Sequence, residues 1–126
     1  MTTSIMPKEI KDKWIAALRS GEYKQAKHVM FDKVIDGGGY CCLGVLQHCI
    51  SGKIVKQEML ETPSRVWLAE HNINFYDGEN TCSTAPVFHI IDDMGEEVEV
   101  WATVLNDDGK SFEFISHLIE EQIEGI

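Results

Sequence analysis

The segment at residues 37–49, GGGYCCLGVLQHC, contains the side chains of this chain that are best placed to do chemistry. Its three glycines run directly into Cys41 and Cys42. A cysteine that follows a glycine-rich turn and opens a helix lies at the positive end of the helix dipole, which lowers the pKa of its thiol. The pattern is therefore compatible with a cysteine nucleophile at the start of a helix.

A thiol nucleophile also needs a base and a group that orients the base. His89 on a predicted strand could be the base, and Asp92 or Asp93 after it could orient the ring, which with Cys41 gives the Cys–His–Asp arrangement of thiol hydrolases. The spacing is loose. We favour the alternative in which the paired cysteines are small apolar core residues and His89 is a half-exposed strand residue, so the chain is not expected to be an enzyme.

A zinc site is the second chemistry to weigh. Cys42 and Cys49 are seven residues apart, which places them two turns apart on one helix face, too far for one ion. Cys82 and His89 have no paired ligand at short spacing. The glycine triplet also lacks the Gly-Lys-Ser/Thr of a phosphate loop. The sequence predicts neither a metal site nor a cofactor.

The elements that would position these side chains follow from hydrophobic periodicity, caps and turn residues. The first two predicted helices are residues 7–19 and residues 41–50. A third is capped by Thr62, begins at Pro63 and has Val66, Trp67 and Ala69 inside. The last predicted helix has one apolar stripe, made of Phe112, Ile115, Leu118, Ile119 and Ile123. The predicted strands are 29–35, 86–91 and 97–101, with a helical turn at 23–28 and loops at 72–84 and 106–111, Ser111 capping the last helix.

The predicted helix at 41–50 is apolar on nearly all sides, which is typical of a helix enclosed by other elements. Cys42 and Cys49 are therefore expected to face the core, whereas Cys41, next to the turn, is expected to be partly exposed. Gly44 is expected to let a neighbouring element approach the helix closely, because it has no side chain.

Taken together, the pattern predicts one domain, residues 1–126, of the α+β class. Helices pack on a small antiparallel sheet, and the strands at residues 86–91 and 97–101 are predicted to form a hairpin. The helix at 41–50 is buried at the centre, and the C-terminal helix carries an acidic face.

The net charge is -10, from 21 acidic and 11 basic residues. Such a body repels phosphate backbones and anionic membranes, so direct binding of nucleic acid or a membrane is not expected. The opening residues, MTTSIMPKEIKDK, lack the apolar region of a signal peptide, and a cytoplasmic protein with reduced thiols is expected. The same charge permits an alternative function, an acidic DNA-mimic-like inhibitor that occupies the basic surface of a nucleic-acid-binding protein.

A candidate binding surface is formed by polar side chains that recur at predicted helix ends. Arginine suits a phosphate group, and tyrosine suits the face of a base. The surface consists of Arg19, Tyr23, Gln25, Tyr40, Asn106 and Asp107.

Three parts of the sequence form an ordered set: residues 19–25 (RSGEYKQ), residues 40–46 (YCCLGVL), and Leu105-Asn106-Asp107 with Ser111-Phe112 before a final Ile/Leu/Glu-rich helix. This set resembles a group of small uncharacterised proteins of bacteriophage and prophage genomes. The resemblance does not cover residues 72–97. It implies a phage accessory protein, and interference with host defence or host enzymes is a common role of such proteins. The function we expect is binding of a host protein or a small nucleotide-like signal, with counter-defence as a possible role.

Overall fold

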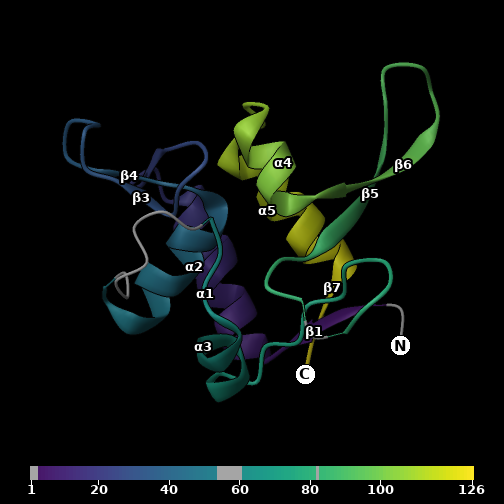
Figure 1. Ribbon diagram of the computed structural model, residues 1–126, viewed down its shortest axis with the longest axis horizontal. Coiled ribbons are helices and arrows are strands. Elements are labelled where there is room, and N and C mark those ends of the chain that lie inside the picture. The colour runs from purple at the N-terminus through teal and green to yellow at the C-terminus, as the bar shows by residue number, and fades with distance from the viewer. Residues whose placement is uncertain (1–2, 54–60, 82) are drawn as a thin grey trace.

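The computed structural model describes residues 3–53, 61–81 and 83–126, which form five helices and seven short strands (Figure 1). The helices are α1 (Lys8–Arg19), α2 (Cys42–Ser51), α3 (Arg65–Glu70), α4 (Ala102–Asp107) and α5 (Phe112–Gln122). The strands are β1 (Ser4–Met6), β2 (Lys24–Gln25), β3 (Phe31–Asp32), β4 (Gly39–Tyr40), β5 (Val87–Ile91), β6 (Glu97–Trp101) and β7 (Ile123–Gly125). None of the helices in these ranges is long and apolar enough to cross a membrane.

The α+β class predicted from the sequence is confirmed, but the strands form three small sheets instead of one. β1 pairs in parallel with β7, so the first and the last strand of the described chain lie side by side (Figure 1). β4 lies between β2, which is parallel to it, and β3, which is antiparallel. Only β5 and β6 form the antiparallel hairpin that the sequence predicts, with Val87 opposite Trp101 and Ile91 opposite Glu97.

The core lies between the helices. α1 packs against both α2 and α5. At the interface between α1 and α2, the Trp14 indole N–H donates to the backbone carbonyl of Cys42 at 2.9 Å. Trp14 is buried, and so are Trp67 and Phe112, which the sequence places on the inner faces of predicted helices. Phe75 lies in the loop before β5, and its ring packs into the core with its centroid 6.1 Å from that of the Trp14 ring.

α2 begins and ends at residues that cap it. Cys41 is the N-cap, and Gly52, with a φ of 74°, ends the helix. The residues from Cys42 to Gln47 are buried, whereas the last four are partly exposed. A Cβ atom at Gly44 would lie 2.0 Å from the carbonyl oxygen of Met30, so the expected close approach at this glycine is confirmed.

The cysteines follow the prediction in part. Cys42 is fully buried, as expected, and Cys49 is only half-buried. Cys41, expected to be partly exposed, is 2% exposed. Its position is enclosed because Met30 accepts the backbone N–H of Cys41 and brings the preceding loop over the start of the helix.

Several predicted boundaries are wrong. The segment at 23–28 contains the short strand β2 in place of the predicted helical turn. The strand at 29–35 is reduced to β3 because bends at residues 27–30 and a turn at residues 33–37 replace the extended backbone. α3 begins at Arg65 with Ser64 as its cap, two residues later than predicted, and Val66 and Ala69 are exposed. Residues 106 and 107 belong to the end of α4 and not to a loop.

α5 has the capping serine and the buried apolar stripe that the sequence predicts. The Ser111 hydroxyl caps α5 by accepting the Phe114 N–H at 3.1 Å. The apolar stripe is buried and continues into β7 at Ile123, while the carboxylates Glu113, Glu120 and Glu121 are exposed. α5 therefore presents one apolar face to α1 and one anionic face to solvent.

Candidate functional site

Asn106 lies at the centre of a polar network that joins α4 to α2 and β2. Its side chain is fully buried. Its Nδ2 donates to the carbonyl of Ala26 at 2.7 Å, and its Oδ1 accepts the Cys42 N–H at 3.2 Å and the Gln25 amide at 3.0 Å. The structure thus brings together Gln25 and Asn106, two residues of the predicted binding surface. Their amides bind each other and the backbone, which makes this part of the predicted surface structural.

Tyr23 and Tyr40, also predicted to bind a ligand, contact each other and the end of α2. Their ring centroids are 5.0 Å apart in an edge-to-face arrangement. The Tyr23 hydroxyl is hydrogen-bonded to His48 Nδ1 at 2.7 Å, and partial burial raises the pKa of Tyr23. The two rings therefore pack against α2 and are only half-exposed.

Arg19 is oriented towards α5. Its Nε donates to the Ser116 hydroxyl at 2.9 Å, its second nitrogen forms an ion pair with Glu120 at 3.4 Å, and its third donates to His117 at 3.2 Å. These contacts join α1 to α5, so Arg19 serves a different interface from that of Tyr23 and Gln25.

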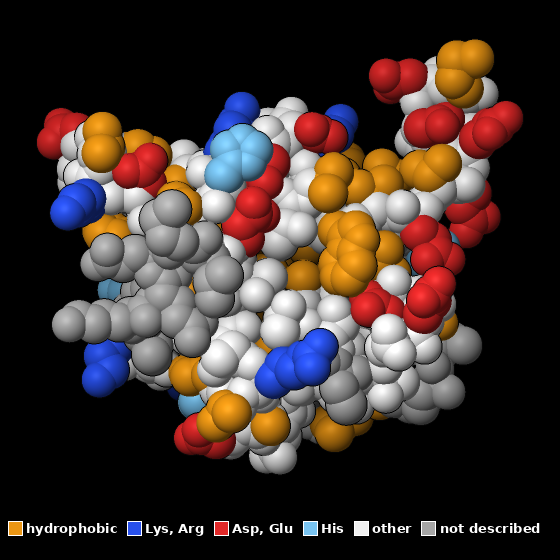
Figure 2. Space-filling view, in the orientation of Figure 1, with side chains coloured by type: hydrophobic (Ala, Val, Ile, Leu, Met, Phe, Trp, Pro, Cys, Tyr) orange, Lys and Arg blue, Asp and Glu red, His pale blue; other side chains and the backbone are white. Residues whose placement is uncertain are grey.

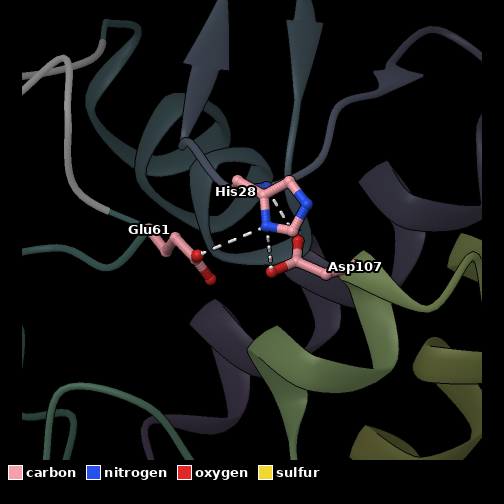
Figure 3. A group of neighbouring side chains, drawn as sticks. All are labelled: His28, Glu61 and Asp107. Atoms are coloured by element: carbon pink, nitrogen blue, oxygen red, sulfur yellow. Dashed lines mark hydrogen bonds and ion pairs between the residues drawn. The ribbon is translucent and has the colours of Figure 1, made fainter.

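Asp107, the last of the predicted binding residues, belongs to a cluster with His28 and Glu61 (Figure 3). The cluster brings together the loop after β2, the segment before α3 and the end of α4. Asp107 Oδ1 accepts the backbone N–H of His28 at 2.8 Å, and its Oδ2 lies 3.1 Å from His28 Nδ1. Glu61 Oε1 lies 3.9 Å from the same nitrogen. His28 is 73% exposed, Glu61 32% and Asp107 15%, so the cluster opens to solvent on the histidine side.

The electrostatics of this cluster are those of two carboxyl groups held close together. Partial burial raises the pKa of Glu61, and the charge of Asp107 and a hydrogen bond with it raise it further, while His28 acts in the opposite direction. One imidazole and two carboxylates are side chains that bind metal ions. Neither His28 nor Glu61 is singled out by the sequence, because no short spacing links them to Asp107.

The Cys41 thiol lies beside this cluster but is not activated by it. Its S–H donates to the carbonyl of Glu61 at 3.3 Å, and its sulfur accepts the Gly44 N–H at 3.3 Å. Burial raises the pKa of Cys41 to about 12, despite the helix N–H groups that favour the thiolate. The pKa of Cys42 is also raised well above its ordinary value by burial. A nucleophile needs the opposite change.

The structure also places His89 away from these thiols. Its backbone N–H and C=O both bind the side-chain amide of Gln122, each at 2.8 Å, and its Nδ1 lies 3.4 Å from Glu97. Asp93 is exposed in the hairpin turn. Among the described residues, no contact joins Cys41 to His89 or Asp93, so the hydrolase arrangement is not assembled. Cys82, considered for zinc, lies outside the described residues.

The β5–β6 hairpin has the most concentrated charge in the chain. Residues 86–101 contain five carboxylates and no Lys or Arg, which is half of the net charge of -10. The hairpin extends from the body (Figure 1), and acidic side chains gather over it at the upper right of Figure 2. Met94 at its tip is 85% exposed.

One edge of this hairpin is covered and the other is open. The outer edge of β5 is covered at two residues. The backbone of His89 is hydrogen-bonded to the Gln122 side-chain amide, and the backbone N–H of Val87 donates to the carbonyl of Tyr76. The backbone N–H of Asp92 donates to the carbonyl of Glu96, so these two residues form a hydrogen-bonded pair of the antiparallel ladder. Hydrogen-bonded and non-hydrogen-bonded pairs alternate along such a ladder. The N–H and C=O groups of Glu97 and Glu99 therefore point away from β5. In the described part of the chain, no backbone hydrogen bond reaches these outward groups.

Trp101 ends the open strand and forms the wall of a small pocket. Its side chain is 40% exposed. The Asp77 carboxylate in the pocket accepts the N–H groups of Glu79 and Asn80, which lowers its pKa and keeps it ionised. A Cβ atom at Gly78 would lie 2.6 Å from Glu99, so the glycine lets this carboxylate approach. The pocket is lined by Asp77, Gly78, Glu79, Glu99 and Trp101.

An aromatic wall with several carboxylates matches the side chain of Lys or Arg, because the ring face and the carboxylates both attract a cation. The fold and these sites define a small α+β protein with an anionic, partly apolar surface. Residues 6–123 match the family model described as Domain of unknown function (DUF8296), and the chain belongs to this family. Neither a curated protein nor a solved structure matches the chain.

Proposed function

We propose that the protein acts by binding another protein, through the open edge of β6, its acidic side chains and Trp101. The observation that carries the proposal is the outward-facing backbone of Glu97 and Glu99 beside the pocket at Trp101. An open edge binds an extended segment of a partner as a further strand, and the pocket beside it gives side-chain specificity.

The chemistry of the surface indicates which partner would fit. Glu97, Glu99 and Trp101 alternate along β6 and share one face of the hairpin. An added strand with Lys or Arg at every second position would place its cations opposite these carboxylates, which is a favourable cross-strand pairing. We therefore expect a partner with a basic, extended segment.

A second copy of this chain is a poor occupant of the same edge. Antiparallel pairing of two β6 strands would bring the carboxylates of both copies together, and like charges directly opposite one another destabilise a sheet. Charged side chains are also a common means of preventing edge-to-edge aggregation. The same carboxylates that prevent self-pairing therefore select a basic partner.

The resemblance to phage and prophage proteins favours a host protein as the partner, bound in the cytoplasm of the host cell, with counter-defence as the biological role. The target could be a nucleic-acid-binding protein whose basic surface the hairpin occupies, which is the acidic-inhibitor form of the proposal. A small nucleotide-like ligand is the less favoured form, because Gln25 and Asn106, expected to bind it, already bind each other.

The test is a titration of isotopically labelled protein with a short synthetic peptide in which Lys alternates with Val, followed by NMR. The expected result is a set of amide shift changes at Glu97 and Glu99 and a change at the Trp101 indole. Affinity should fall as salt is added. A peptide in which Glu replaces Lys should not bind.

Charge-reversal variants separate edge binding from general attraction to an acidic protein. The variant Glu97→Lys/Glu99→Lys should lose most of the binding, whereas Glu113→Lys/Glu124→Lys, which changes the same number of charges elsewhere, should lose little. Equal losses in the two variants, or shift changes spread over α5, would overturn the proposal.

A further inference from the structure

We propose that His28, Glu61 and Asp107 form a binding site for a divalent transition-metal ion of the zinc class. The site draws one imidazole nitrogen and two carboxylate oxygens from three separate segments of the chain (Figure 3). It lies at the start of α2, and it is distinct from the β5–β6 hairpin that is proposed to bind a partner.

The distances are close to those that a metal ion requires. Zinc binds nitrogen and oxygen ligands at about 2.0–2.1 Å in tetrahedral geometry, which places neighbouring ligand atoms about 3.3 Å apart. His28 Nδ1 lies 3.1 Å from Asp107 and 3.9 Å from Glu61, and all three ligand atoms lie within 4.8 Å of one another. The widest of these separations exceeds the tetrahedral spacing by at most about 1.5 Å, a distance that side-chain rotation can close.

The charge of the cluster also favours a cation. Glu61 and Asp107 are held close together, and in the described residues neither forms an ion pair with Lys or Arg. Two nearby carboxylates repel each other unless a proton or a cation lies between them. A divalent ion would balance both charges.

The donor set selects among metals. An imidazole with two carboxylates suits Zn²⁺, Co²⁺ or Ni²⁺, whereas Ca²⁺ and Mg²⁺ prefer sites made of oxygen alone. Three protein ligands leave a further position for water or for a ligand from another molecule. Because His28 is largely exposed, this position would face solvent. The Cys41 sulfur is not a ligand in this proposal, because its thiol is enclosed and hydrogen-bonded to Glu61 and Gly44.

The test is titration of the whole purified chain with Co²⁺ and Zn²⁺ after treatment with a chelator. Co²⁺ is followed by its visible absorption, and Zn²⁺ by calorimetry. We expect one ion per chain, with visible bands and no thiolate-to-cobalt band in the near ultraviolet, because only nitrogen and oxygen bind it. Cys49→Ala should bind the ions as tightly as the original protein, which would show that the half-buried Cys49 thiol is not a ligand.

Two variants remove ligands with little risk to the fold. His28 has a φ of 70°, and asparagine tolerates this left-handed backbone better than most residues, so His28→Asn is preferred to alanine. Glu61→Gln keeps the shape of the side chain. Each change should weaken binding at least about tenfold, in line with the loss of one ligand. Circular dichroism and the melting temperature of the metal-free variants show whether they fold.

The matched control is His117→Asn, because His117 lies 3.9 Å from Glu113 on the surface of α5 and forms another histidine–carboxylate pair. This variant should bind the ion as tightly as the original protein. The proposal is overturned if no ion binds at micromolar concentration, if His28→Asn and Glu61→Gln bind as tightly as the original, or if His117→Asn loses the ion instead.

Discussion

The side chain of Asn106 accepts the backbone N–H of Cys42 at 3.2 Å, so the first residue of α2 is hydrogen-bonded to a residue that lies 64 positions later in the sequence. The first N–H groups of a helix have no partner within the helix. At this helix, Asn106 supplies one partner, and the Cys41 sulfur supplies another by accepting the Gly44 N–H. α2 is thus capped both from its own segment and from α4.

Asn106→Ala is expected to destabilise the protein by roughly 2–4 kcal/mol, because it leaves the Cys42 N–H and the Ala26 carbonyl buried without partners. The measurement is the free energy of unfolding in urea. Asn74→Ala is the control, since the Asn74 side chain is exposed and the change should cost less than about 0.5 kcal/mol. Equal stabilities for the two variants would contradict a capping role.

Gly44→Ala should cost at least about 3 kcal/mol or prevent folding, because the new Cβ atom would lie 2.0 Å from the backbone oxygen of Met30. The oxygen belongs to the backbone and cannot move aside as a flexible side chain would. Val45→Ala, at the next and equally buried position, removes volume instead of adding it and serves as the comparison. A thermal melt of Gly44→Ala close to that of the original protein would show that the loop at Met30 is free to move.

The three thiols in the described part of the chain should react slowly and in a definite order. At neutral pH, iodoacetamide should modify Cys49 before Cys41 and Cys42, because Cys49 is only half-buried and its pKa is raised to about 11, against about 12 for Cys41. The rate at Cys49 should rise about tenfold per pH unit, since only the thiolate reacts. Peptide mapping by mass spectrometry gives each rate. Fast, selective modification of Cys41 in the folded protein would restore the thiol-enzyme interpretation.

Gln122→Ala should loosen the hairpin from α5, because the Gln122 amide makes two hydrogen bonds to the backbone of His89, both at 2.8 Å. We expect a loss of about 1–2 kcal/mol. Hydrogen exchange at the His89 amide is the local measurement, and it should become much faster. Gln122→Glu retains the acceptor and should retain part of the protection. Unchanged exchange in Gln122→Ala would show that Gln122 does not hold the edge of β5.

Local signals were sufficient for the larger elements. α1, α5 and the β5–β6 hairpin were predictable because their apolar residues recur with one period over several turns or along a strand. Ser111 and Gly52 mark helix ends by chemistry that acts within a few residues. The burial of Cys42 also followed from its neighbours, since a helix apolar on nearly all sides must be enclosed.

The tertiary structure decided what depends on distant segments. Strands of two or three residues, such as β2 and β3, are too short to show a period, and their pairing depends on which backbone groups meet. The parallel pairing of β1 with β7 joins the two ends of the chain, and no local pattern records it. The same holds for sites: the sequence predicts Gln25 and Asn106 as binding residues because their side chains are polar, and only the packing shows that their amides are hydrogen-bonded to each other. His28, Glu61 and Asp107 become neighbours for the same physical reason, because burial of the core brings together the loops that carry them.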